Sequence, residues 1–125
     1  MNIPADLLYS SDHEWIKIEG DTATLGITDY AQSELGDIVM IEFETGTDEV
    51  NKGDSLGTLE AVKTVSDVFA PLSGTVLEVN GDLEAEPEKI NTDPYGAGWI
   101  ARIKLNNPDE KNQLLNAQQY SDLAE

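Results

Sequence analysis

A single lysine near the middle of the chain is the residue best placed to do chemistry. Lys63 lies between two β-rich segments, 55–59 and 65–69, so the sequence predicts that it stands near the tip of a hairpin. A primary amine on a flexible stem can carry an acyl cofactor through an amide bond, and a rigid hairpin would present it. A solvated turn lysine shows the same local pattern, so hairpin position alone leaves both interpretations open.

The groups that most enzymes use are rare in this chain. The absence of cysteine excludes disulfides, zinc–thiolate sites, iron–sulfur clusters and cysteine nucleophiles. One histidine leaves little for a Ser-His-Asp triad or a histidine-rich metal site. His13 lies beside Trp15, which favours a structural strand residue over a base or a ligand. The sequence therefore predicts a protein that is not itself an enzyme and holds no metal.

Length and charge indicate one acidic domain, assigned to residues 1–125. A chain of 125 residues with 39% hydrophobic residues can bury one modest core. Its net charge of −18 argues against binding nucleic acid or an anionic membrane, and favours partners with basic surfaces. No run of 18 apolar residues and no signal or transit segment is visible, which predicts a cytoplasmic protein.

The elements that must position Lys63 are mainly short strands. An acidic stretch with two prolines, 80–98, predicts a long surface loop, and helix-like spacing predicts a small C-terminal helical segment over about 107–125. A short helical turn over 30–35 can be capped by Thr28 or Asp29 and ends at Gly36. Two loosely similar halves suggest a flattened barrel with pseudo-two-fold symmetry, although recurrent turn chemistry would look the same. The predicted strands are 14–19, 22–28, 37–43, 55–59, 65–69, 75–79 and 99–105.

The segment around Lys63 resembles the attachment motif of the biotinyl/lipoyl carrier family. Over residues 53–76 it reads Gly-Asp-x-Leu-Gly-x-Leu-Glu-Ala-Val-Lys, a short spacer, and Ala-Pro-x-Ser-Gly-x-Val. Within that family the chain is similar to the H-protein family of the glycine cleavage system. Several independent blocks in the same order carry this resemblance over nearly the whole chain: 13–15, 26–32, 35–39, 65–67 and 93–99.

The resemblance implies both a fold and a function. The fold is a mainly β, flattened hybrid barrel or sandwich of two sheets with a helical C-terminal end. The function is that of a carrier, with (R)-lipoate attached to Lys63 by a lipoate ligase or a lipoyl/octanoyl transferase. The lipoyl arm would take the aminomethyl group of glycine from the P protein (glycine decarboxylase) to the T protein (aminomethyltransferase). The L protein (dihydrolipoyl dehydrogenase) would then reoxidise the arm, whose reactive sulfurs belong to the cofactor.

The resemblance also implies roles for residues outside the motif lysine. Glu60 and Val62 are read by the lipoylating enzyme or merely support the hairpin. Glu14 lines the cleft that receives the loaded arm, where an acid can hold an ammonium group; an exposed acid at a strand start is the alternative. Asp67 shapes the path of the arm or is solvated. Asp12 departs from the serine of many relatives, so the hydroxyl at that position is missing.

Four other functions compete with this interpretation. Biotin acceptors favour methionine on both sides of the lysine, whereas Val62 and Thr64 flank it here. Lipoyl domains of 2-oxoacid dehydrogenases are shorter and lack both the 13–15 block and the C-terminal helix. An unmodified adaptor would carry Lys63 as an ordinary surface lysine. A related carrier could instead relay lipoate to other acceptor proteins.

Overall fold

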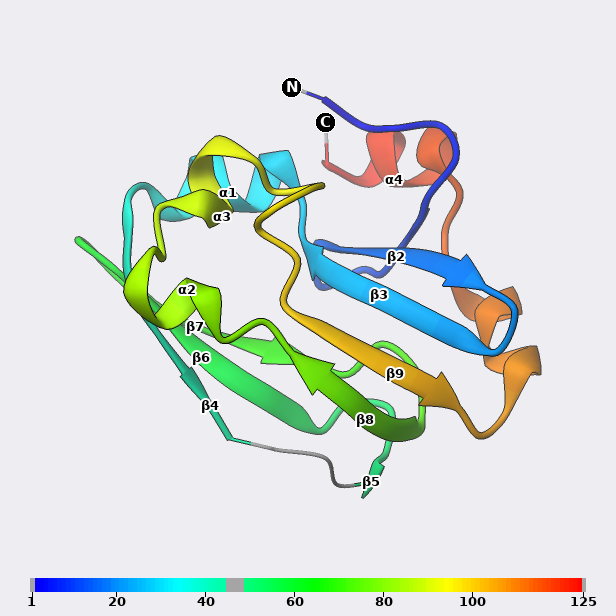
Figure 1. Cartoon of the computed structure of the whole chain (residues 1–125). Coiled ribbons are helices and arrows are strands. Elements are labelled where there is room, and N and C mark those ends of the chain that lie inside the picture. The colour runs from blue at the N-terminus through cyan, green and yellow to red at the C-terminus, as the bar shows by residue number, and fades with distance from the viewer. Residues whose placement is uncertain (1, 45–48, 125) are drawn as a thin grey trace.

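A computed structural model describes residues 2–44 and 49–124, and two antiparallel sheets dominate it (Figure 1). The larger sheet has the order β1 (Leu8–Tyr9), β2 (Glu14–Glu19), β3 (Thr22–Ile27), β9 (Ala101–Leu105), β8 (Gly74–Val79) and β5 (Glu49–Val50). The smaller sheet has the order β4 (Ile38–Phe43), β6 (Ser55–Ala61) and β7 (Val65–Phe69). The sheets are not closed into a barrel, so the predicted fold is confirmed in its sandwich form. The pseudo-two-fold relation stays a prediction.

One hydrophobic core joins the two sheets. Leu25 and Ile103 come from the larger sheet and Leu59 and Val68 from the smaller one, and all four are buried in the same cluster. Side chains alternate between the two faces of a strand, so each strand turns one apolar set inward. The predicted strands are confirmed with small changes at their ends; the last one begins at Ala101 rather than at residue 99.

The predicted helical turn is confirmed as α1 (Asp29–Leu35). Its N-terminus is capped by Thr28, whose side-chain oxygen accepts a hydrogen bond from the Ala31 backbone N–H. Gly36 follows the helix with a φ of 80°, a conformation that disfavours residues with a side chain. The helix therefore begins and ends where its capping residues dictate.

The prediction of a long surface loop over 80–98 is wrong. The segment forms two short helices, and Leu83 and Ile90 are fully buried in the main core. The acids marked the solvent-facing side correctly, but Pro94 is buried, and the two apolar residues fasten the segment to the sandwich. The helices are α2 (Asp82–Ala85) and α3 (Lys89–Thr92).

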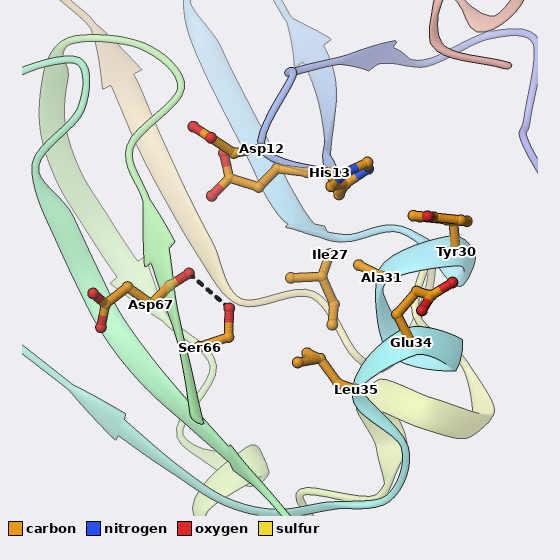
Figure 2. Close-up of a pocket in the computed structure, with 10 residues that line it drawn as sticks. Asp12, His13, Ile27, Tyr30, Ala31, Glu34, Leu35, Ser66 and Asp67 are labelled. Carbon is orange, nitrogen blue, oxygen red and sulfur yellow. Dashed lines mark hydrogen bonds between the residues drawn. The ribbon is translucent and has the colours of Figure 1, made fainter. Parts of the chain in front are cut away.

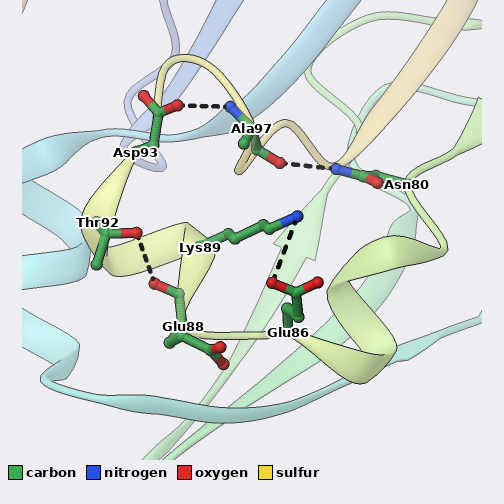
Figure 3. A network of polar contacts seen from close by, with 7 residues as sticks. All are labelled: Asn80, Glu86, Glu88, Lys89, Thr92, Asp93 and Ala97. Carbon is green, nitrogen blue, oxygen red and sulfur yellow. Dashed lines mark hydrogen bonds and ion pairs between the residues drawn. The ribbon is translucent and has the colours of Figure 1, made fainter.

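Side-chain hydrogen bonds fix the same segment from within (Figure 3). The Asn80 amide donates to the Ala97 carbonyl at 2.9 Å, and the Ala97 N–H donates to the Asp93 carboxylate at 2.9 Å. Lys89 also pairs with Glu86 at 3.6 Å on the surface. A segment with such internal bonding is an ordered cap on the sandwich.

The C-terminal helical segment is broken into two pieces, and residue 125 lies outside the described residues. Between the pieces, the Leu115 backbone exchanges two hydrogen bonds with Tyr9, which requires extended chain. The Tyr120 ring then stacks on the Tyr9 ring, with 4.7 Å between centroids. None of the helices in the described part of the chain is long and apolar enough to cross a membrane. The two pieces are a 3-10 helix, η1 (Pro108–Gln113), and α4 (Ala117–Ala124).

Candidate functional site

Lys63 lies at the tip of the β6–β7 hairpin, as predicted. The Ala61 N–H donates to the Thr64 carbonyl at 2.8 Å and closes the turn. The Val62 N–H donates to the Asp37 carbonyl at 3.1 Å and ties the tip to the chain after α1. Both Val62 and Lys63 are exposed, and within the described residues the Lys63 amine has no hydrogen-bond or ion-pair partner. The backbone of the tip is therefore fixed while the amine is free.

A groove beside this amine adjoins a second pocket. Val62 and Lys63 line the groove together with residues 33–37. The pocket has a volume of about 250 Å³ and shares Glu34 and Leu35 of α1 with the groove. A long side chain attached to Lys63 could therefore pass from the groove into the pocket along the end of α1.

The pocket lies between strand β7 and helix α1 (Figure 2). Ser66 and Asp67 of β7 form one wall, and Asp12 and His13 lie at one end. The opposite wall is mostly apolar. This combination suits a ligand that is apolar along its length and cationic at its end. The opposite wall comprises Ile27, Tyr30, Ala31, Glu34 and Leu35.

Glu14 is the buried acid of this pocket, with only 1% of its surface exposed. Its carboxylate accepts hydrogen bonds from the Ser10 hydroxyl at 3.1 Å and from the Phe69 N–H at 2.8 Å. Burial raises the pKa of Glu14 to about 8; the charge of Asp12 adds to the rise, and the two hydrogen bonds oppose it. Within the described residues Glu14 has no ion pair. The alternative of an exposed strand-start acid is therefore wrong.

The other predicted site residues divide between separate surfaces. Asp67 lines the Glu14 pocket, but its carboxylate points away from it and accepts a hydrogen bond from Thr58 at 3.2 Å on the outer face of the smaller sheet (Figure 2). Glu60 does not reach this pocket. It pairs across the smaller sheet with Met40 and Val65, and the three line a third groove. Glu14 therefore places its carboxyl group in the pocket, whereas the carboxylates of Asp67 and Glu60 lie on the outer face of the smaller sheet.

His13 is a correction to the sequence analysis. It precedes β2, in a turn with a φ of 65°, and is not a strand residue. This left-handed conformation is one that histidine adopts more readily than most residues. The imidazole lines the pocket, and its Nδ1 lies 2.9 Å from the Tyr120 hydroxyl. His13 therefore makes its hydrogen bond to Tyr120 at the edge of the pocket.

Sequence reasoning missed Ser10 and the contribution of α1. Ser10 supplies a hydroxyl to Glu14 although Asp12 occupies the position of the family's usual serine. Tyr30 and Glu34 lie within or near the 26–32 block that resembles the family, but the pattern there indicated only a capped helix. The resemblance of that block to the family was the sequence signal that could have assigned α1 to the pocket. Within the described residues, no group of three or more His, Asp or Glu side chains could hold a metal ion.

Comparisons with known proteins agree along the full chain. The profile of the family described as Glycine cleavage H-protein matches residues 7–125. A glycine cleavage system H protein of Staphylococcus saprophyticus is 49% identical over 123 residues, covering 98% of each chain. That of Staphylococcus carnosus is 48% identical with the same coverage.

The fold gives the same answer as the sequence. The crystal structure of a glycine cleavage system H protein from Mycobacterium marinum matches with a TM-score of 0.86 and 41% identity, covering 96% of this chain and 97% of that one. These matches confirm the resemblance carried by the motif blocks. The chain belongs to the glycine cleavage H-protein family, the lipoyl carriers of the glycine cleavage system, which are carrier subunits and not catalysts.

Proposed function

We propose that Lys63 carries (R)-lipoate and that residues 1–125 act as one carrier domain. The observation that carries the proposal is the exposed Lys63 amine at a hairpin tip, beside a groove that adjoins a pocket with a buried acid. Val62 and Thr64 flank the lysine where a biotin acceptor favours methionine, which supports lipoate over biotin. A rigid tip with a free amine is what a modifying enzyme needs to reach.

The pocket fits a lipoyl arm in length and in character. From the lysine Cα to the nearer ring sulfur, the arm has about as many bonds as four residues of backbone, which extend to roughly 14 Å at most. Asp67, on the pocket wall, is four residues from Lys63, so the arm reaches the pocket. Ile27, Ala31 and Leu35 offer an apolar surface for its alkyl chain. Bound lipoate supplies a disulfide whose opened sulfur takes up and releases the aminomethyl cargo.

Glu14 is proposed to hold the ammonium group of that cargo. The carboxyl is buried and oriented by Ser10 and Phe69, yet lacks a cation among the described residues. A positive charge brought within a few ångströms favours the ionised carboxylate and counteracts the rise in its pKa. The pocket would thus bind the cationic end and keep water from it between enzymes.

The partners follow from this role and are part of the proposal. The P protein (glycine decarboxylase) loads the cargo, the T protein (aminomethyltransferase) removes it, and the L protein (dihydrolipoyl dehydrogenase) restores the disulfide. A lipoate ligase or lipoyl/octanoyl transferase modifies Lys63, and Glu60 and Val62, which lie near the hairpin, are available for it to read. We place this cycle in the cytoplasm, with no role for nucleic acid or membrane.

Intact-mass analysis tests the attachment site. After co-expression with a lipoate ligase, the wild-type chain should gain the mass of one lipoyl group, and Lys63→Arg should gain none. Lys17→Arg is the matched control, because Lys17 is also exposed but lies on a regular strand; this variant should be modified normally. Biotin on Lys63, lipoate on another lysine, or an unmodified wild-type chain would contradict the proposal.

A further inference from the structure

A chain of hydrogen bonds links the C-terminal helix α4 to the pocket wall. The Ala31 N–H donates to the Thr28 hydroxyl at 3.1 Å. The Thr28 hydroxyl lies 2.7 Å from the Tyr120 hydroxyl, which lies 2.9 Å from Nδ1 of His13. Thr28 and Tyr120 are both fully buried. Since water does not reach these hydroxyls, the direction of each hydrogen bond can be worked out from donors and acceptors alone.

The direction is set at the Ala31 end. A backbone N–H can only donate, so the Thr28 oxygen accepts from it, and the Thr28 proton needs an acceptor of its own. Within the described residues the only such acceptor is the Tyr120 oxygen. Tyr120 then directs its own proton to His13 Nδ1. Burial raises the pKa of Tyr120, which keeps the phenol protonated and able to donate.

The reverse direction leaves a buried donor without an acceptor. If Nδ1 carried a proton, it would donate to Tyr120, and Tyr120 would donate to Thr28. The Thr28 proton would then be buried without a partner, which is costly in a desolvated site. A doubly protonated imidazole meets the same obstacle. The network therefore disfavours both the Nδ1–H tautomer and the imidazolium ion.

We propose that Tyr120 is a positioning residue of the pocket, and that it holds His13 as a neutral imidazole with its proton on Nε2. The Tyr30 ring packs on the imidazole with 4.9 Å between centroids, and Tyr9 stacks on Tyr120, so both rings of the pair are held in place. This assigns α4, an appendage to the sandwich, a role in the site.

The consequence for the cargo rests on the proposed function. An imidazolium at His13 would place a positive charge on the pocket wall, where it would compete with the ammonium group of the cargo for the carboxyl groups nearby. A neutral His13 leaves these carboxyl groups available for the incoming ammonium group instead. The ionisable residues that line the pocket with His13 are Asp12, Glu14, Tyr30, Glu34 and Asp67, of which Asp67 turns its carboxylate away from the pocket.

Nitrogen NMR of the unmodified chain tests this assignment, because the chain has one histidine. In the ¹⁵N-labelled protein at neutral pH, His13 should show a protonated Nε2 and an unprotonated Nδ1. Tyr120→Phe keeps the ring but removes the hydroxyl, and should give a mixture of tautomers. Tyr9→Phe is the matched control: its hydroxyl is also in a buried cluster but donates to the Pro4 carbonyl, so the His13 signals should not change. Thr28→Ser keeps the hydroxyl and should retain the wild-type signature.

Each of several outcomes would overturn the proposal. They are a wild-type His13 protonated on Nδ1, unchanged His13 signals in Tyr120→Phe, and equal changes in Tyr9→Phe and Tyr120→Phe. The wild-type assignment decides the matter by itself if Tyr120→Phe fails to fold. Since the measurement uses the chain without lipoate, its result is independent of whether Lys63 is modified.

Discussion

The pocket around Glu14 and the hairpin around Lys63 are built in opposite ways. Glu14 accepts a hydrogen bond from Phe69, 55 residues away, and His13 contacts Tyr120, 107 residues away. The Lys63 side chain has no such partner among the described residues. Long-range side-chain contacts fix the receiving surface, whereas the attachment point is fixed by backbone hydrogen bonds, one within the turn and one to Asp37. A carrier whose arm must enter several enzymes needs this division, because an arm tethered at its base by side-chain contacts could not reach them.

The largest expected effect is a difference in stability between the two regions. Ile27 lines the pocket with 5% of its surface exposed, whereas Val62 at the hairpin is 70% exposed. Ile27→Ala should lower the free energy of unfolding by about 2–5 kcal/mol. Val62→Ala should change it by no more than about 0.5 kcal/mol. Urea unfolding of both variants measures this, and similar losses in the two would break the comparison.

The second effect is a pH dependence of the free energy of unfolding, which arises from Glu14 in the pocket. The pKa of Glu14 is about 8 in the folded chain against an ordinary value of 4.5, so the folded state keeps a proton that the unfolded state has lost. Stability from this group is therefore full below pH 4.5 and falls as pH rises towards 8. At about 1.4 kcal/mol per pKa unit, the loss amounts to a few kcal/mol.

Glu14→Gln isolates that contribution from the other acids of the chain. Glutamine keeps an oxygen for the Phe69 N–H and cannot ionise. The unfolding free energy of Glu14→Gln, relative to wild type, should therefore rise steadily between pH 5 and pH 8. Urea titrations of both proteins at several pH values measure the difference. A constant difference across this range would mean that Glu14 is not held in its neutral form.

The same contrast explains what the sequence could predict. Local signals sufficed for the seven predicted strands, for a capped helix that begins at Thr28 or Asp29 and for the hairpin position of Lys63, because these depend on neighbouring residues. The burial of Glu14 could not be predicted, since it requires Ser10 and the Phe69 backbone to meet it across the fold. The prediction of a surface loop over 80–98 failed for a related reason. The composition of the segment is that of a loop, whereas its packing on the core depends on Leu83 and Ile90.

A smaller effect should appear in the lifetime of the cargo. If Glu14 holds the ammonium group, a charge-assisted hydrogen bond of about 1.5–3 kcal/mol is lost in Glu14→Gln. At about tenfold per 1.4 kcal/mol, ammonia release from the isolated, loaded carrier should be at least roughly tenfold faster. Glu49→Gln removes an exposed acid on β5 and should decay like wild type. Equal decay of Glu14→Gln and wild type would remove Glu14 from this role, while lipoylation at Lys63 would be unaffected.

The smallest expected effect is a difference between the buried pocket and the exposed acidic surface in their response to salt. With a net charge of −18 and the exposed acids Glu42 and Glu44 on the outer face of the smaller sheet, docking to a basic partner should rely partly on long-range attraction. The screening length falls from about 10 Å at 0.1 M salt to about 3 Å at 1 M. The affinity for the aminomethyltransferase should therefore fall several-fold over that range.

Glu14 is buried, and ions screen a buried pair much less, so cargo decay on the isolated carrier should change little. Binding and decay measured in the same salt series provide the test. An affinity that is flat with salt would show that the acidic surface does not steer docking, and a decay rate as salt-sensitive as binding would show that the pocket is not shielded.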